Sequence, residues 1–300
     1  MIPICLITGF LGTGKTTLLK RIVAENRDRK WIYLVNEFSA LDVDGAIVSE
    51  ENPDVVSIPG GSIFCKCLVT EFIGQMTKIY EQHPDAEGVV IEASGMADPR
   101  VIAVMLKETR LDQHFELANI VSIVEPRSFL RLIHTLPNII HQVEAADTVL
   151  LNKCDLFDEA QLVETEQAVR NIKPDANLLR CVNGGARFPI IGKTGLHTNL
   201  HGEYAKCRDP CYSTFSTVFA QPVDPAMVET LIRENDDAIY RVKGYFQSVD
   251  GPVYFDYSKA GFSVTPTEPK EKYGLAWIIQ GDAEERLNAD TVCATLSHIN

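Results

Sequence analysis

Residues 9–16, GFLGTGKT, form a complete phosphate-binding loop. The pattern requires Gly at its first and sixth positions, then Lys, then Ser or Thr. Its glycines let backbone N–H groups surround a polyphosphate, its Lys reaches the β- and γ-phosphates, and its hydroxyl binds Mg²⁺. The residues of this stretch predicted to bind nucleotide are Gly9, Gly12, Thr13, Gly14, Lys15, Thr16 and Thr17. Lys15 is also a predicted catalytic residue, and Thr16 a predicted magnesium ligand.

The sequence on either side of the loop supports this assignment. Residues 4–8 (ICLIT) are an apolar run typical of a buried strand, and residues 17–26 carry apolar side chains at helical spacing. The loop therefore joins a strand to a helix, whose N-terminus favours anions.

Composition limits the class of protein. The chain has 300 residues, enough for one large domain or two ordinary ones, and 45% of them are hydrophobic. A net charge of −13 argues against a nucleic-acid partner, because such partners need clustered Lys and Arg. The sequence shows neither a long apolar span nor a leader-like start, so we expect no membrane association and a cytoplasmic location.

Apolar strands and helices alternate through the first two thirds of the chain, which predicts an α/β fold of the P-loop type with a mainly parallel sheet and helices on both faces. The expected strands are 31–35, 55–58, 88–91, 119–124 and 148–151, and the expected helices 68–82, 99–108, 127–135 and 158–171. A smaller α+β domain follows, with strands at 212–219, 239–248, 252–257, 261–265 and 275–280 and helices at 224–235 and 283–298. The predicted boundaries are 1–185 for the nucleotide domain, 186–211 for a connector and 212–300 for the second domain.

Asn152, Lys153, Cys154 and Asp155 follow the strand that ends at residue 151. An N-K-x-D loop at the end of a strand favours guanine, because the Asp carboxylate can accept hydrogen bonds from both N1–H and the N2 amino group. Adenine lacks that pair of donors, so a buried Asp would be left unpaired. Asn152, Lys153 and Asp155 are thus predicted to bind the base. The alternatives are a plain surface loop, or an ATP-dependent kinase that makes no use of the Asp.

Two further loops begin at acidic residues, and Glu92, Gly95 and Glu37 are predicted catalytic residues there. Glu92 closes the strand at 88–91 and is followed by Gly95; Glu92 is placed to hold Mg²⁺, and Gly95 to meet the γ-phosphate. The alternative role for this segment is a helix N-cap at Ser94 or Asp98. Glu37 follows the strand at 31–35 and could bind Mg²⁺, orient water or hold a second metal; the alternative is a solvated loop acid.

These motifs, in this order, resemble the CobW-type GTPases, which are metal-handling P-loop proteins related to the hydrogenase and urease nickel-insertion GTPases. The matching stretches are GFLGTGKTT (9–17), NEF (36–38) with Asp44 downstream, EASGMADP (92–99), LLNKCDL (150–156) and RVKG (241–244). The resemblance covers nearly the whole chain.

The resemblance implies a Mg²⁺-dependent GTPase of slow intrinsic turnover, which binds GTP or GDP and assists metal delivery or metallocofactor assembly in a client enzyme. Zn²⁺, Co²⁺ and Ni²⁺ are the candidate metals, and a monomer or a homodimer is expected. A rival from another class is a GTP-switched chaperone for a cofactor-dependent enzyme that carries no metal itself.

The family's Cys-x-Cys-Cys metal motif is altered in this chain. By position, Ser62 and Phe64 stand where the first two cysteines are expected, Cys65 keeps the third, and Cys67 is additional. The resemblance places Glu37 near this segment, so Cys65, Cys67 and Glu37 are the predicted transition-metal ligands. The alternative is that Cys65 and Cys67 are ordinary loop thiols.

A second set of candidate ligands lies in the predicted connector. Its members are His197, His201, Cys207 and Cys211. Their H-x3-H and C-x3-C spacings are compatible with a tetrahedral site, and the alternative is a loop that happens to hold two His and two Cys.

Overall fold

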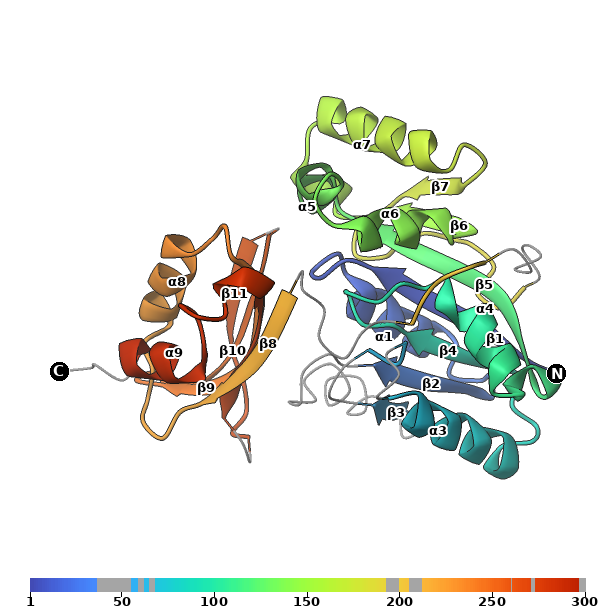
Figure 1. Ribbon diagram of the computed structural model, residues 1–300, viewed down its shortest axis with the longest axis horizontal. Helices are drawn as coiled ribbons and strands as arrows, with labels where there is room; N and C mark the ends of the chain where they lie inside the picture. Colours follow the sequence, from blue (N-terminus) through green and yellow to red (C-terminus); the bar gives the residue numbers. More distant parts are fainter. Residues whose placement is uncertain are drawn as a thin grey trace. The chain divides into compact units, whose positions relative to one another are not determined.

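The computed structural model describes residues 1–36, 55–58, 62–64, 68–192, 200–204, 212–259, 261–270 and 273–296. These residues form two compact units (Figure 1). The described residues up to 204 belong to the first unit, and those from 212 onward belong to the second. Each unit is described by itself below. The boundaries predicted at 185 and 211 stay a prediction.

The first unit is built on a seven-stranded sheet in the order β3-β2-β4-β1-β5-β6-β7. Every pairing among these strands is parallel. The strands are β1 (Ile2–Gly9), β2 (Trp31–Asn36), β3 (Val55–Ile58), β4 (Gly88–Glu92), β5 (Phe115–Val124), β6 (Thr148–Leu151) and β7 (Asn177–Arg180). Parallel strands are buried on both faces, which explains their nearly continuous apolar sequences.

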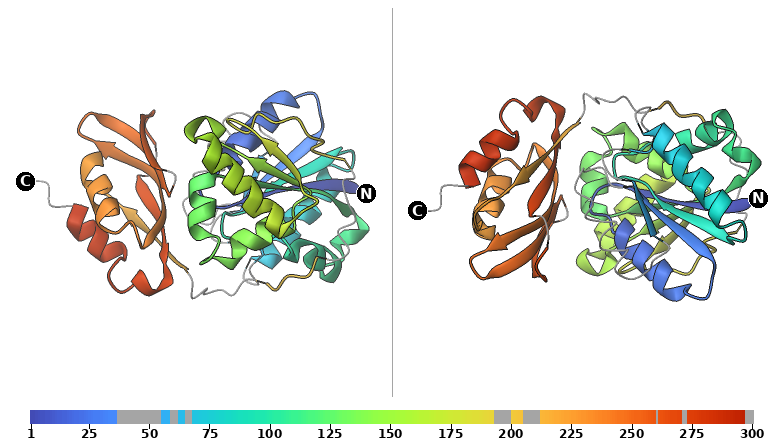
Figure 2. Two further views of the ribbon diagram at one scale, coloured as in Figure 1. Left: turned by 90° about the horizontal axis from the view of Figure 1, so that it is seen from above. Right: turned by 90° about the horizontal axis from the view of Figure 1, so that it is seen from below.

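Helices cover both faces of this sheet, as predicted. Helix α1 packs on the side to which Cys5 and Ile7 of β1 point, and α3 and α4 lie on the opposite side (Figure 2). The helices are α1 (Lys15–Glu25), α3 (Val69–Gln82), α4 (Val101–Glu108), α5 (Pro126–Leu132), α6 (Pro137–Glu144) and α7 (Glu159–Ile172), with short 3-10 turns η1 (Leu111–Gln113) and η2 (Cys154–Leu156). The predicted fold class is therefore confirmed.

The second unit is a five-stranded antiparallel sheet in the order β11-β10-β9-β12-β8. Its elements are β8 (Tyr212–Val218), α8 (Pro225–Glu234), β9 (Ile239–Ser248), β10 (Gly251–Ser258), β11 (Gly261–Pro266), β12 (Gly274–Gln280), η4 (Gly281–Ala283) and α9 (Ala289–Leu296). Both helices pack against one core, which contains Val228 of α8, Val292 of α9 and the buried Trp277 of β12. An α+β unit was predicted here.

The structure differs from the sequence prediction at three places. The chain forms a helix, α6, and a strand, β7, where none was predicted. The helix expected at 283–298 is instead the turn η4 followed by α9. The break has a local cause, because Asn288 Oδ1 accepts from Thr291 N at 3.1 Å, the contact of a helix N-cap.

No helix in the described ranges has both the length and the apolar character needed to cross a membrane.

Candidate functional site

The strand order brings the predicted motifs to one edge of the first sheet. Strands β2, β4 and β1 are direct neighbours, and β6 is separated from β1 by β5. In a parallel sheet all carboxyl ends point to the same edge, where ligands of open α/β folds bind. The phosphate loop after β1, the acidic loop after β4 and the N-K-x-D loop after β6 therefore lie along one edge.

The path of the phosphate loop depends on glycine. Gly9, Gly12 and Gly14 have φ of 139°, 77° and 106°, which side chains rarely allow. A Cβ on Gly9 would lie 2.4 Å from the Ile123 carbonyl oxygen, and one on Gly14 would lie 2.5 Å from Asn152 Nδ2. The glycines thus shape a loop of backbone that can wrap an anion, so the loop fits the polyphosphate for which it was predicted.

Lys15 and Thr13 bind the loop itself. Lys15 Nζ donates to the Phe10 carbonyl at 3.1 Å, and Thr13 Oγ1 donates to the same oxygen at 2.9 Å. The lysine is buried at the start of α1, so its ammonium group is already inside the loop. Its ammonium group is thus placed among the backbone groups of the loop predicted to hold the phosphates.

Thr16 and Glu92 are in direct contact. Thr16 Oγ1 donates to Glu92 Oε1 at 2.9 Å, and Glu92 is buried at the last position of β4. In the sheet register Glu92 lies opposite Ile7 of β1, next to the start of the loop. A hydroxyl and a carboxylate are hard oxygen donors of the kind that Mg²⁺ prefers, so this pair fits a magnesium ion.

Asn152 connects the predicted guanine loop to the phosphate loop. Its Nδ2 donates to the Thr13 carbonyl at 2.8 Å, and its Oδ1 accepts from Gly184 N at 3.0 Å. Lys153 has a left-handed backbone (φ 61°), and Asp155 follows in η2 with an exposed side chain. Asn152 therefore holds the phosphate loop and the Gly184 turn together, whereas the exposed Asp155 carboxylate is accessible to a base.

Gly184 was missed in the sequence. Its φ is 67°, and an added Cβ would lie 3.1 Å from the Cα of Leu18 on α1. The signal for it was the turn sequence Asn183-Gly184-Gly185 directly after β7. This turn places a second backbone segment beside the N-K-x-D loop.

Helix α6 holds the loop that follows β4. Gln142 Nε2 donates to the carbonyls of Gly95 and Ala97, both at 3.1 Å, and Asn138 Nδ2 donates to Met96 O at 2.7 Å. On the other side, a Cβ on Gly95 would lie 2.8 Å from Leu11 N in the phosphate loop. The Gly95 backbone is thus packed between the phosphate loop and α6.

The carboxylate of Asp98, at the end of this loop, contacts Arg100 and His141. Arg100 Nη2 lies 2.8 Å from Asp98 Oδ2, and His141 Nδ1 of α6 lies 3.1 Å from the same atom. Burial raises the pKa of Asp98, but the hydrogen bonds from His141 and Arg100 outweigh burial and leave that pKa below its ordinary value. Asp98 is consequently charged at neutral pH, and it ties Arg100 and α6 to the loop.

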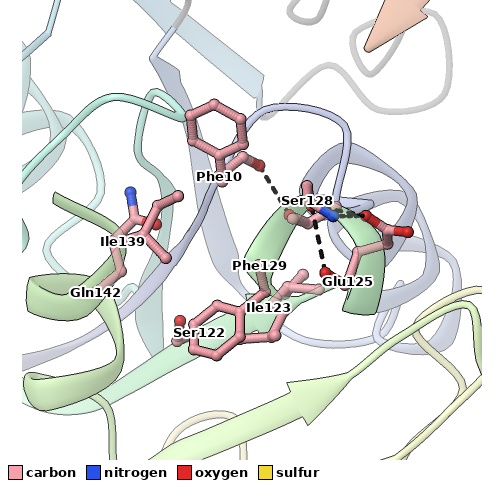
Figure 3. Close-up of a pocket in the computed structure, with 10 residues that line it drawn as sticks. Phe10, Ser122, Ile123, Glu125, Ser128, Phe129, Ile139 and Gln142 are labelled. Carbon is pink, nitrogen blue, oxygen red and sulfur yellow. Dashed lines mark hydrogen bonds between the residues drawn. The ribbon is translucent and has the colours of Figure 1, made fainter. Parts of the chain in front are cut away.

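A small pocket lies behind the phosphate loop (Figure 3). It is lined by residues of the loop, β5, α5 and α6, among them Phe10, Ser128, Ile139 and Gln142. Glu125 is buried at its edge, where it accepts from Ser128 Oγ at 2.6 Å and from Ser128 N at 2.9 Å as the N-cap of α5. Its space of about 210 Å³, partly open to solvent, is smaller than a typical ligand site, so we assign it to packing behind the loop.

Comparison with known proteins agrees with this geometry. The family model described as CobW/HypB/UreG, nucleotide-binding domain, matches residues 3–180. The chain belongs to this family. Its members share the nucleotide-binding domain that the loops above form.

Individual relatives agree with the family assignment. The zinc chaperone YeiR of Escherichia coli (strain K12) is 32% identical over 167 residues, which are 55% of this chain and 49% of YeiR. The zinc chaperone CobW of Sinorhizobium sp is 26% identical over 331 residues, covering 95% of this chain and 90% of that protein. The chain spans about half the length of YeiR and of a Dictyostelium discoideum relative, zinc-regulated GTPase metalloprotein activator 1.

Among solved structures, Zn(II)-bound YjiA GTPase from E. coli is similar to this chain. It has a TM-score of 0.48 and 21% sequence identity, with 100% of this chain and 99% of that chain covered.

Several of the predicted residues of this CobW/HypB/UreG family member lie outside the described residues. They are Glu37, Asp44, Cys65, Cys67, His197, Cys207 and Cys211. Within the described ranges, no group of three or more His, Cys, Asp and Glu side chains could hold a metal ion. His201 is described, and its side chain is exposed.

The positions that replace the family's first two cysteines are described and buried. Ser62 and Phe64 have relative exposures of 2% and 0%, and Phe64 N donates to Ser62 Oγ at 3.2 Å. A buried aromatic ring offers no metal ligand.

Proposed function

We propose that this chain is a Mg²⁺-dependent GTPase whose nucleotide state controls metal handling for a client enzyme. The observation that carries the nucleotide part is the bond from Asn152 Nδ2 to the Thr13 carbonyl, which joins an N-K-x-D loop to a phosphate loop. This bond fixes the distance between the segment that would select a base and the segment that would hold its phosphates.

Each residue has a distinct task in the proposed site. Lys15 and the amides of the phosphate loop bind the phosphates, and the Asp155 carboxylate accepts from the guanine N1–H and N2 amino groups. Thr16 and Glu92 would hold the magnesium ion, which neutralises charge on the phosphates when bound. Gly95 would donate its N–H to the γ-phosphate, and its carbonyl accepts from Gln142. Glu37 is proposed to orient water or to complete a metal site.

The metal part of the proposal rests on the relatives and on two thiols. YeiR and CobW are named zinc chaperones, and Cys65 and Cys67 supply soft ligands of the kind that Zn²⁺ takes. Cys65, Cys67 and Glu37 are the proposed ligands of the transported ion. The client is proposed to be an enzyme that needs this metal.

Nucleotide preference tests the first part. Titration of the Mg²⁺-supplemented protein with GTP and with ATP should show tighter GTP binding, and the protein should release phosphate from GTP. A preference for ATP would leave Asp155 without a task and would support an ATP-dependent kinase.

Metal titration tests the second part. The reduced protein is titrated with Zn²⁺, Co²⁺ and Ni²⁺ in the presence of GDP or a non-hydrolysable GTP analogue. One ion should bind tightly, and the Cys65→Ser/Cys67→Ser variant should lose it. Cys293→Ser, which removes a partly buried thiol of α9, is the matched control and should keep it. GTP binding without metal binding would support the client chaperone that carries no metal.

A further inference from the structure

One buried amide joins three segments at the edge of the first sheet. Asn36 is the last residue of β2 and is 3% exposed. Its Nδ2 donates to the Ile58 carbonyl at 3.1 Å, at the end of β3. Its Oδ1 accepts from Ile63 N at 3.0 Å and from Ser94 N at 3.4 Å.

The chemistry of the amide is required for this set of contacts. The carbonyl of Ile58 needs a donor, and the N–H groups of Ile63 and Ser94 need an acceptor. An Asn side chain supplies both, whereas an aliphatic side chain of similar size supplies neither. Because the site is buried, a lost partner leaves a backbone group unsatisfied, which is unfavourable.

The contacting segments lead directly to the proposed nucleotide and metal residues. Ser94 precedes Gly95, the residue proposed to meet the γ-phosphate, and Ile63 stands two residues before Cys65. Successive Cα atoms are about 3.8 Å apart, so movement at Gly95 also moves the Ser94 amide. At 3.4 Å the Ser94 bond is the longest of the three, so its geometry is the weakest.

Residues 62–64, which Asn36 contacts through the Ile63 amide, are firmly packed. Ile63 and Phe64 are fully buried, and Ser62 Oγ accepts from Phe64 N. Close-packed interiors of this kind transmit strain to their neighbours. A shift of the Ile63 amide would therefore also be felt at Phe64.

We propose that Asn36 is a positioning residue that transmits the nucleotide state of the Ser94–Gly95 loop to residues 62–64, which precede the proposed metal ligand Cys65 in the sequence. This inference rests on the proposed function, since it needs both a bound nucleotide and a bound metal. Asn36 itself binds neither of them; it acts through the Ser94 and Ile63 backbone amides.

The test compares zinc affinity in two nucleotide states. The dissociation constant for Zn²⁺ is measured with GDP and with a non-hydrolysable GTP analogue, for the full chain and for Asn36→Ala. The ratio of the two constants should be about 5 or more in the wild type, the lower range of allosteric coupling, and about 1 in the variant. Asn36→Asp keeps the acceptor oxygen for Ile63 and Ser94, so it should retain a ratio above that of Asn36→Ala.

Asn119→Ala is the matched control. Asn119 is a fully buried amide of β5 that donates to the carbonyls of Pro189 and Ile190, so its loss removes comparable bonds away from both loops. The ratio of the two Zn²⁺ dissociation constants in Asn119→Ala should stay at the wild-type value.

Amide hydrogen exchange on the wild-type protein is a second test, which does not depend on whether a variant folds. Protection of the Ile63 and Ser94 N–H groups should change together when GDP is replaced by the GTP analogue. The inference is overturned if the ratio of the two Zn²⁺ dissociation constants is 1 in the wild type, or if folded Asn36→Ala keeps the wild-type ratio. It is also overturned if the Ile63 and Ser94 amides exchange independently of each other. These outcomes leave nucleotide and zinc binding intact, whereas failure of either binding overturns the proposed function.

Discussion

Gly14 shows how a missing side chain can be a binding determinant. Its φ of 106° and the 2.5 Å approach of Asn152 Nδ2 leave no place for a Cβ. Gly14→Ala should therefore lower the stability of the first unit by about 2 kcal/mol and weaken GTP binding by at least about tenfold. Both quantities can be measured by denaturant unfolding and by nucleotide titration.

The matched control for this change is Gly74→Ala. Gly74 lies inside helix α3, where an added Cβ meets no atom within 4 Å. Alanine costs less entropy than glycine in a helix, so this variant should be about 0.5–1 kcal/mol more stable and bind GTP normally. Equal effects of the two substitutions would contradict the role given to Gly14.

Asp155 determines the base in the proposed site. Asp155→Asn exchanges a double acceptor for one acceptor and one donor, which suits the 2-oxo group of xanthine better than the 2-amino group of guanine. Loss of charge-assisted hydrogen bonds worth about 1.5–3 kcal/mol should weaken GTP binding by about 10- to 150-fold. Competition between GTP and xanthosine triphosphate measures the change. Unaltered GTP preference would mean that the base is selected elsewhere.

Asp98 gives a pH dependence with a defined sign. Its pKa is lower in the folded state than in the unfolded chain, so its charge stabilises the fold above the unfolded pKa, which is about 3.9. This contribution is lost as the pH falls from about 4 through the folded pKa. The wild type should exceed Asp98→Asn in stability at pH 7, and the difference should shrink below pH 4. Denaturant unfolding at a series of pH values tests this, and a constant difference would refute it.

At the level of elements, α6 links the sheet to the loop after β4. Gln142→Leu keeps the size of the side chain but removes both donors to Gly95 and Ala97. Two buried carbonyls then lose a partner, so stability should fall by about 2–4 kcal/mol and GTP turnover should decrease because Gly95 is no longer held. Gln167→Leu, on an exposed position of α7, should change stability by less than about 0.5 kcal/mol.

The sequence predicted most of these elements because their apolar periodicity is strong. Strand β3 and helix α3 were found almost to the residue, since β3 is a bounded apolar run and α3 has a clear buried face. Helix α6 was missed because it has eight residues and begins at Pro137 soon after α5 ends. Its signal was Pro at the first helical position, followed by Ile139 and Val143 at helical spacing.

The site was predictable where a motif fixes the backbone, and less so where contacts are tertiary. The phosphate loop and the N-K-x-D loop contain their own chemistry in consecutive residues. The contacts of Asn36, Gln142 and Gly184 join segments far apart in the chain, and only the strand order brings these together. In the sequence, Asn36 stands out only as the residue before Glu37, and nothing there indicates its contacts.

At the scale of the whole molecule, each unit has its own core and its own tryptophan. The chain has two tryptophans. Trp31 is buried in β2 of the first unit, and Trp277 is buried in β12 of the second, where its Nε1 donates to Thr217 Oγ1 at 3.0 Å. Fluorescence of Trp277→Phe therefore reports unfolding of the first unit, and that of Trp31→Phe reports the second.

Nucleotide binding should shift the unfolding transition of the first unit alone. GDP at 100 times its dissociation constant should stabilise the first unit by about 2.7 kcal/mol, because it binds the folded state alone. The transition reported by Trp277 should not move. If both transitions shift by the same amount, the two units unfold as one, and the independence of their cores is refuted.

The position of β1 has a consequence for the newly made chain. This strand is synthesised before both of its neighbours in the sheet, because β4 and β5 are completed only at Glu92 and Val124. At about 5–20 residues per second, the ribosome needs on the order of ten seconds to supply both. During that time an almost entirely apolar strand lacks its partners. We therefore expect β1, the central strand of the sheet, to benefit from protection by a chaperone while the protein is being made.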